Sequence, residues 1–469
     1  MKKYLLILLA CIPGLVSDAY GQIVALTVPE SDKVTLGNVQ VSKDSDNIYV
    51  DYDILFGSRI LSCLVGLEVS LNAGKSFEPV TDGLSGDIHR VESSGHKRIA
   101  LPLNIYAKKF ADESIIFNVF VSDVVLAPSV HEFDYSSALN LSTGGTANCY
   151  IVSRGGVYSI LPVKGNSSVS VGSVAYAEVL WESFGTSETP KIGDLIEAAL
   201  YSDGQIYFKV PSAFREGNAV IAAKDASGTI LWSWHIWLTD QPKEQVYYNN
   251  AGTMMDRNLG ATSAAPGDVV ARGLLYQWGR KDPFLGSSSI STKMIEARST
   301  VKWPAAVETS SETGTVNYAT ENPMVYLTGS KSNKWDWHYS SRNNNLWHSS
   351  KTIYDPCPSG WRVPDGGEYG VWVKASRDEQ VKCSYDRRNI GINFVGKFGD
   401  DSIIWYPICG SRSCSDEGEL VQGYYGNYWS VSLYSDSVYS LYFNNPGFVF
   451  MLSRGDSRAS GQSVRCIKE

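Results

Sequence analysis

The chain has 469 residues and a formal net charge of −8, and it contains no runs of Lys or Arg. A mildly acidic chain is a poor binder of nucleic acid, because neutralising phosphates supplies most of that affinity, so we expect no nucleic-acid partner. At roughly 150 residues per domain, the length predicts about three domains. The 27 Tyr and 13 Trp residues, and short alternating runs ended by Gly, Asn, Asp or Ser, favour a mainly β protein.

The N-terminus has the pattern of a secretory signal. Two Lys residues precede an apolar stretch that ends near Val16, and this stretch is shorter than the roughly 20 residues needed to cross a bilayer. Small residues just before Gln22 predict cleavage there, which makes residues 1–21 a signal peptide. An alternative is a lipoprotein signal with Cys11 as the lipidated residue. In both cases we expect an exported protein, at the cell surface or outer membrane or outside the cell. A lipid anchor is expected only in the alternative with lipidated Cys11, and no other membrane contact is predicted.

Residues 22–128 are predicted to form the first domain. The stretch Ile48–Ile54 alternates apolar and polar residues, as does Leu67–Leu71, which runs into the turn sequence Asn72–Lys75. Several short strands within about 100 residues predict an immunoglobulin-like β-sandwich. The sequence LEVSLNAGKSF (67–77) also resembles immunoglobulin-like modules of exported Bacteroidetes proteins, and this resemblance implies a spacer.

A second β-rich domain is predicted over residues 138–241. Asp203-Gly204 is a strong hairpin signal, and the apolar run Thr229–Trp237 is expected to be the last strand. Trp232 and Trp234 share one face of that strand. They are interpreted either as a sugar-stacking platform or as core, and the preference of aromatic residues for half-buried strands favours the core.

Residues 246–469 carry the most specific motifs. In chain order these are MDRNLGA (255–261), GLLYQWGR (273–280), CPSGWRVP (357–364), YWS (428–430) and SVRC (463–466). The set resembles the Fibrobacter succinogenes major paralogous domain family, found on exported proteins of the Bacteroidetes and their relatives. The resemblance implies an α+β, C-type-lectin-like domain with two helices, a twisted, mostly antiparallel sheet and chain ends close together. The Glu-Pro-Asn and Trp-Asn-Asp motifs of calcium-dependent lectins do not occur, so calcium-dependent sugar binding is not expected.

Seven cysteines follow the predicted signal, and this odd number leaves at least one thiol unpaired. Within the region of family resemblance, Cys357 and Cys466 are the expected long-range disulfide, and Cys409 with Cys414 is a possible local one. The remaining cysteines have no assigned pairing: Cys63, Cys149 and Cys383. No pair has C-x-x-C spacing and no H-E-x-x-H sequence occurs, so neither a metal nor a cofactor is predicted.

Two polar-aromatic segments of the C-terminal region are candidate binding sites. The first, residues 427–460, is rich in the Tyr, Ser and Asn of adaptable binding surfaces, and its candidates are Tyr434, Tyr439, Tyr442, Asn444 and Asn445. It is interpreted as a ligand-binding face, as a variable region like those of retroelement-diversified lectin-fold proteins, or as an ordinary Tyr-rich sheet edge. The second, residues 335–348, either stacks on sugars or fills the core beneath a loop, and its candidates are Trp335, Trp337, Asn344 and Trp347.

No catalytic pattern accompanies these segments. The sequences G-x-S-x-G and G-x-x-x-x-G-K do not occur, and Asp416-Glu417 lies in a Gly/Ser context typical of a solvated turn. The sequence therefore predicts a non-catalytic, exported cell-surface binding or adhesion protein that presents a lectin-like C-terminal domain to a glycan or protein ligand. The alternatives are a structural envelope or pilus-associated component without a soluble ligand, and a diversity-generating variable ligand-binding protein. An enzyme is not expected.

Overall fold

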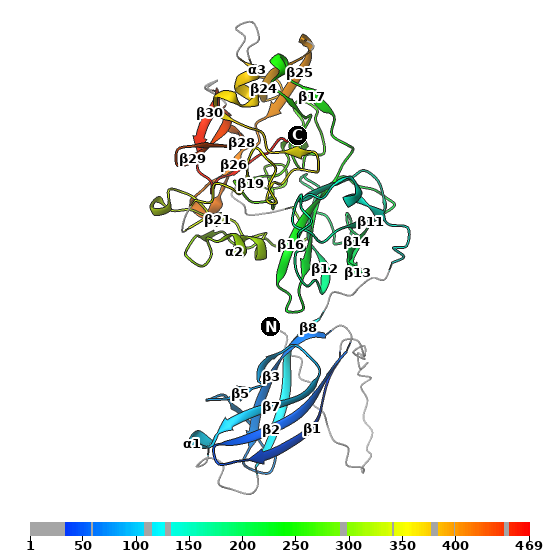
Figure 1. The fold of residues 1–469 in the computed structure, drawn as a ribbon, viewed down its shortest axis with the longest axis vertical. Coiled ribbons are helices and arrows are strands. Elements are labelled where there is room, and N and C mark those ends of the chain that lie inside the picture. Colours follow the sequence, from blue (N-terminus) through cyan, green and yellow to red (C-terminus); the bar gives the residue numbers. More distant parts are fainter. Residues whose placement is uncertain are drawn as a thin grey trace, which may run out of the picture. The chain divides into compact units, whose positions relative to one another are not determined.

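The computed structural model describes residues 33–57, 60–106, 115–126, 133–290, 298–339, 342–376, 383–397, 399–444 and 450–469. Strands make up 43% of the residues and helices 9%, which confirms the prediction of a mainly β protein. The described residues divide into two compact units (Figure 1): unit 1 falls within residues 1–130 and 226–228, and unit 2 within 131–225 and 229–469. No helix in these described ranges is long and apolar enough to cross a bilayer. The predicted signal peptide, Cys11 and Asn445 lie outside the described residues.

Unit 1 contains two antiparallel sheets. One sheet has the strand order β1 (Val34–Lys43), β2 (Asn47–Phe56), β7 (Gly95–Pro102) and β5 (Ser85–Gly86). In the other sheet, β3 (Ile60–Ser70) pairs with β4 (Glu78–Val80), β6 (His89–Val91) and β8 (Ile116–Leu126). A single helical turn, α1 (Leu103–Tyr106), follows β7.

The core of unit 1 forms between these sheets because their strands alternate apolar and polar residues. Val50 and Tyr52 of β2 are fully buried, and Leu67 of β3 is almost fully buried in the same cluster. The two predicted strands and the turn between β3 and β4 are confirmed. The chain passes through Ala73 and Gly74, both at positive φ, before β4 pairs back on β3.

Unit 2 begins with two four-stranded sheets. The first has the order β10 (Cys149–Val152), β16 (Ile230–Leu238), β15 (Gly217–Lys224) and β12 (Tyr176–Ser183). The second has the order β13 (Ala198–Ser202), β14 (Gln205–Val210), β11 (Gly156–Ile160) and β9 (Leu139–Asn140). Asp203 and Gly204, both at positive φ, form the predicted hairpin turn between β13 and β14.

The C-terminal part of unit 2 is built from smaller sheets and long loops. Two sheets have the orders β17 (Glu244–Val246), β18 (Thr253–Met255), β32 (Ile467–Lys468), β22 (Trp361–Arg362), and β19 (Tyr276–Gln277), β31 (Gly461–Gln462), β26 (Ser411–Arg412), β27 (Leu420–Val421). Two three-stranded sheets contain β23 (Ser384–Asp386), β24 (Gly391–Gly396), β25 (Gly399–Pro407), and β28 (Tyr425–Tyr434), β29 (Ser437–Asn444), β30 (Phe450–Asp456). A parallel pair and two short helices accompany them: β20 (Val307–Glu308), β21 (Leu327–Thr328), α2 (Val316–Glu321) and α3 (Val371–Ala375).

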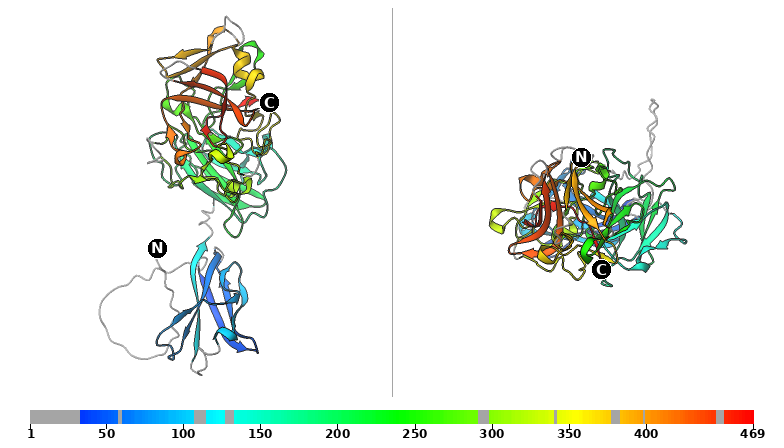
Figure 2. Two further views of the ribbon diagram at one scale, coloured as in Figure 1. Left: turned by 90° about the vertical axis from the view of Figure 1, so that its left-hand side faces the viewer. Right: turned by 90° about the horizontal axis from the view of Figure 1, so that it is seen from above.

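Strand β16 joins the two parts of unit 2 because both of its faces are buried. Trp232 and Trp234 pack into the core of the first two sheets, so the core interpretation of these rings is confirmed and the sugar-stacking one is wrong. On the opposite face, Trp237 belongs to the core of the C-terminal part, and its indole N–H donates to the carbonyl of Ala261 (3.1 Å). Residues 138–241 and 246–469 therefore share a continuous core and lie in one compact body (Figures 1 and 2).

His235 lies on the same face of β16 as Trp237 and is buried. Its Nε2 is 2.9 Å from Oδ1 of Asn218, whose own amide donates to the carbonyl of Gly260 (2.9 Å). Burial lowers the pKa of His235 to about 3, so the ring is neutral at physiological pH.

One disulfide links Cys357 and Cys466, which are 109 residues apart, and this expected pair is confirmed. The local bridge between Cys409 and Cys414 is absent, because both are free thiols. Cys409 Sγ is buried, 3.0 Å from the hydroxyl of Tyr428, whereas Cys414 is half-buried. The other cysteines of the described chain are buried free thiols: Cys63, Cys149 and Cys383.

Replacing both Cys357 and Cys466 by Ser is expected to lower the free energy of unfolding of unit 2 by about 4 kcal/mol, because the disulfide closes a long loop in the unfolded chain. All 13 Trp residues follow residue 180, so Trp fluorescence during urea unfolding reports unit 2 alone. Cys414→Ser, which removes a free thiol, is the control and should change the midpoint little. A double variant as stable as the parent chain would contradict this expectation.

The stability of unit 2 is expected to fall as the pH drops below about 6.5, because the unfolded chain protonates His235 while the folded chain holds it neutral down to about pH 3. The contribution is roughly 1.4 kcal/mol per pH unit within this window. His235→Gln should flatten the pH dependence of urea unfolding between pH 6 and pH 4 by about that slope. If the free energy of unfolding depends on pH in the same way in His235→Gln and in the parent, His235 is not the group responsible.

Candidate functional site

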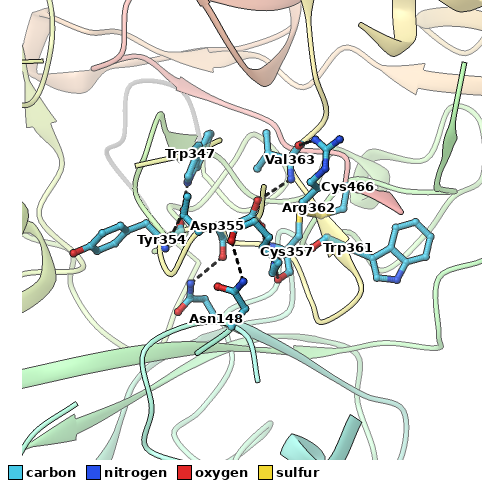
Figure 3. Close-up of polar contacts among 12 residues, drawn as sticks. Asn148, Trp347, Tyr354, Asp355, Cys357, Trp361, Arg362, Val363 and Cys466 are labelled. Atoms are coloured by element: carbon cyan, nitrogen blue, oxygen red, sulfur yellow. Dashed lines mark hydrogen bonds and ion pairs between the residues drawn. A yellow bond between two sulfur atoms is a disulfide. The ribbon is translucent and has the colours of Figure 1, made fainter. Parts of the chain in front are cut away.

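A buried carboxylate holds the CPSGWRVP motif in place (Figure 3). Asp355 accepts hydrogen bonds from the backbone N–H groups of Cys357 and Val363, both at 2.9 Å, and from Lys351 Nζ at 2.7 Å. The amide of Asn148, which precedes β10, donates to the Asp355 carbonyl (2.8 Å). Asp355 therefore orients Cys357 for its disulfide, and its carbonyl links the C-terminal part to the first two sheets.

The remaining motifs also contact one another. Trp278 of GLLYQWGR donates through Nε1 to the carbonyl of Ser430 in YWS (3.0 Å). Arg465 of SVRC donates through Nε to Asn258 Oδ1 of MDRNLGA (3.1 Å). Because all four residues are buried, these motifs build the core of the C-terminal part and are not exposed to a ligand.

The structure separates the predicted residues of the 335–348 segment into core and surface. Trp337 and Trp347 are at most 1% exposed, and their indoles donate to the carbonyls of Trp278 (2.7 Å) and Tyr354 (2.8 Å). These two rings fill the core and offer no face to a ligand. Trp335 is half-buried and Asn344 is exposed, so these two candidates remain at the surface.

The predicted residues of the second segment lie on the hairpin of β28 and β29. Tyr434 is 50% exposed and its ring is 4.9 Å from that of the half-buried Tyr439. Tyr442 is largely buried beneath the guanidinium of Arg454, which lies 4.2 Å from its ring centre. Asn444 ends β29 and is half-buried. Tyr434 is therefore the most accessible of the described candidates on this hairpin.

Ion pairs join the hairpin to the 335–348 segment. Asp436, in the turn between β28 and β29, pairs with both Lys334 and Arg342. These charged residues are not among the candidates predicted from the sequence, because no local pattern marks a contact between residues about 100 positions apart. We call the resulting surface the rim, and define it by Lys334, Trp335, Arg342, Asn344, Tyr434 and Asp436.

Arg458 supports the rim from below. Its Nη2 donates to Asn344 Oδ1 (2.6 Å), and its Nη1 lies 3.7 Å from the carboxylate of Asp336. Burial raises the pKa of Asp336 and lowers that of Arg458, so the pair is weakened by its own desolvation. The neighbouring Ala459 N–H donates to the Trp335 carbonyl (3.0 Å), which fixes the backbone under that ring.

A cavity of about 430 Å³ opens beside Trp335. Its lining combines one aromatic residue with acidic and hydroxyl-bearing residues, and consists of Ala306, Glu308, Thr328, Gly329, Ser330, Trp335, Ser415, Asp416 and Glu417. The Gly/Ser context of Asp416-Glu417 predicts a solvated turn, and both residues are exposed. In the structure this turn lies at the cavity wall, with both acidic residues at positive φ, and no local pattern in the sequence indicated that position.

One buried contact has the composition of a nucleophilic pair. Lys281 Nζ lies 2.6 Å from both Ser233 Oγ and Asp282 Oδ1, and the Ser233 hydroxyl donates to the same carboxylate oxygen. All three side chains are at least 94% buried, and burial lowers the pKa of Lys281. A substrate cannot reach this hydroxyl, so the contact fastens β16 to the C-terminal part.

Across the described ranges, no three His, Cys, Asp or Glu side chains are grouped to hold a metal ion.

No family model and no curated protein matches this chain.

Asp355→Asn is expected to destabilise unit 2 by about 3–5 kcal/mol, because it leaves the buried ammonium of Lys351 without its counter-charge. The control is Asp365→Asn, which breaks the more exposed pair with Arg362 and should cost less than about 1 kcal/mol. Urea unfolding followed by Trp fluorescence measures both. Equal effects of the two variants would contradict the role given to Asp355.

Proposed function

We propose that this protein is a non-catalytic, exported surface-binding or adhesion protein whose ligand, a glycan or a protein, binds at the rim. The observation that carries the proposal is the joining of two polar-aromatic segments, far apart in sequence, by the ion pairs of Asp436 with Lys334 and Arg342. Exposed ion pairs contribute little to stability, so stability alone does not account for such a surface.

The chemistry of the rim suits recognition. Tyr434 offers a large rigid ring at low entropic cost, and the amide of Asn344 can exchange hydrogen bonds with a ligand. Tyr339, which is 44% exposed, adds another ring within the 335–348 segment. Aromatic residues and Arg are enriched among the residues that dominate binding energy at interfaces.

The finer fold assignments belong to this proposal. Two antiparallel sheets enclosing one core support an immunoglobulin-like sandwich for unit 1, which would act as a spacer. In the C-terminal part, β17 and β32 both pair with β18, so the start and the end of this region meet in one sheet. That closeness of the chain ends supports a lectin-like domain.

Binding by residues 22–469 to glycan and protein arrays tests the proposal. Tyr434→Ala is expected to weaken binding to the selected ligand by about tenfold or more, since truncating an anchoring aromatic residue commonly costs over 1 kcal/mol. Tyr424→Ala is the matched control, because Tyr424 is 59% exposed and precedes β28 at the end opposite Tyr434.

The absence of any ligand for the folded protein would overturn the proposal. Self-association of the chain without a ligand would instead favour a structural envelope component. Both outcomes are read from the same arrays combined with sedimentation of the purified protein.

A further inference from the structure

We propose that the cavity beside Trp335 seats an uncharged or amino sugar, so that the ligand of the proposed function is a glycan without acidic groups at this position. This inference rests on the proposed function and names its ligand class. The volume of about 430 Å³ falls within the roughly 300–1,000 Å³ of small-molecule sites.

The lining supplies both kinds of contact that a pyranose ring needs. Trp335 is the one aromatic residue of the lining, and an aromatic ring offers hydrophobic area to the C–H face of a sugar. Around it, the carboxylates of Glu308 and Glu417 accept hydrogen bonds from sugar hydroxyls, and the hydroxyl of Ser330 can donate or accept. An aliphatic ligand would leave these polar groups desolvated and unpaired, which is costly.

The floor of the cavity is fixed by backbone pairing. Glu308 of β20 lies opposite Thr328 of β21 in parallel register, so a carboxylate and a hydroxyl are held side by side. The wall opposite the Trp335 turn is tied to the end of β21, because Gly329 N–H donates to the Cys414 carbonyl (2.8 Å). The lining is thus formed before a ligand arrives.

The Trp335 ring is held by a turn of unusual backbone geometry. Lys334 and Trp335 have φ values of 56° and 59°, a conformation that costs energy for residues other than Gly or Asn. Asn333 stabilises this turn: its amide donates to Thr309 Oγ1 (2.9 Å) and to the Asp336 carbonyl (2.7 Å), and its Oδ1 accepts from the Ser330 N–H. Asn333 is therefore a positioning residue for the ring.

The charge of the lining sets the selectivity. Three acidic residues line the cavity, Glu308, Asp416 and Glu417, and no Lys or Arg is among the lining residues. Uronic and sialic acids carry a carboxylate of their own and would be repelled, whereas neutral and amino sugars would not. The cavity is therefore expected to discriminate by charge between sugars of the same ring shape.

The test titrates residues 22–469 with the methyl glycosides of glucose, galactose, mannose and N-acetylglucosamine, and with methyl glucuronide, using ligand-observed saturation-transfer NMR. At least one neutral glycoside should bind, and the glucuronide should bind at least tenfold more weakly than the glucoside. Trp335→Asn removes the ring while keeping a residue that tolerates positive φ, and it should reduce binding at least tenfold. Glu308→Gln, at an exposed position, removes one negative charge and should narrow the difference in affinity between the glucoside and the glucuronide.

Tyr424→Ala is the matched control and should leave glycoside binding unchanged, because the exposed Tyr424 belongs neither to the rim nor to the cavity lining. The inference fails if none of the four neutral glycosides binds, if Trp335→Asn binds as well as the parent, or if the glucuronide binds as tightly as the glucoside. A ligand on the arrays that depends on Tyr434 and not on Trp335 would overturn the cavity assignment alone and leave the proposed function standing.

Discussion

The burial of both faces of β16 is the constraint on which the architecture of unit 2 depends. Trp232 and Trp234 complete the core of the first two sheets, while Ser233, His235 and Trp237 lie against the C-terminal part. A polar side chain on such a doubly buried strand requires a partner, since an unpaired buried group costs roughly 1–3 kcal/mol. Asn218 and Lys281 provide those partners, and the polar pairs thereby set how the C-terminal part docks.

The packing of unit 2 also determines where the residues of the rim lie. Once the motifs of the C-terminal part are fixed in the core, the hairpin of β28 and β29 and the turn at Trp335 emerge next to each other, where Asp436 can reach Lys334. The turns that emerge carry consecutive non-Gly residues at positive φ, at Lys334 with Trp335 and at Asp416 with Glu417. Such backbone costs about 1–3 kcal/mol per residue and persists where surrounding contacts over-determine it, which is a property of binding sites.

Two buried guanidinium groups in the core of unit 2 lie against aromatic rings. Arg465 is buried with its guanidinium 3.7 Å from the centre of the Tyr406 ring, and it donates to the Trp405 carbonyl (2.9 Å). Arg412 lies 3.8 Å from the Tyr326 ring, and burial lowers its pKa to about 10. The abundance of Tyr and Trp in this chain thus reflects core construction as much as surface recognition.

The sequence by itself determined the β character, the alternating strands of unit 1, the Asp203-Gly204 hairpin and the core position of Trp232 and Trp234. Each of these depends on a local period or turn preference, which short-range sterics enforce. Only the tertiary structure decided that Trp337 and Trp347 are core while Trp335 borders a cavity, since loop residues have no period that marks a buried face. It alone brought Glu308 and Glu417 to that cavity across more than 100 residues, because packing between distant segments leaves no local trace in the sequence.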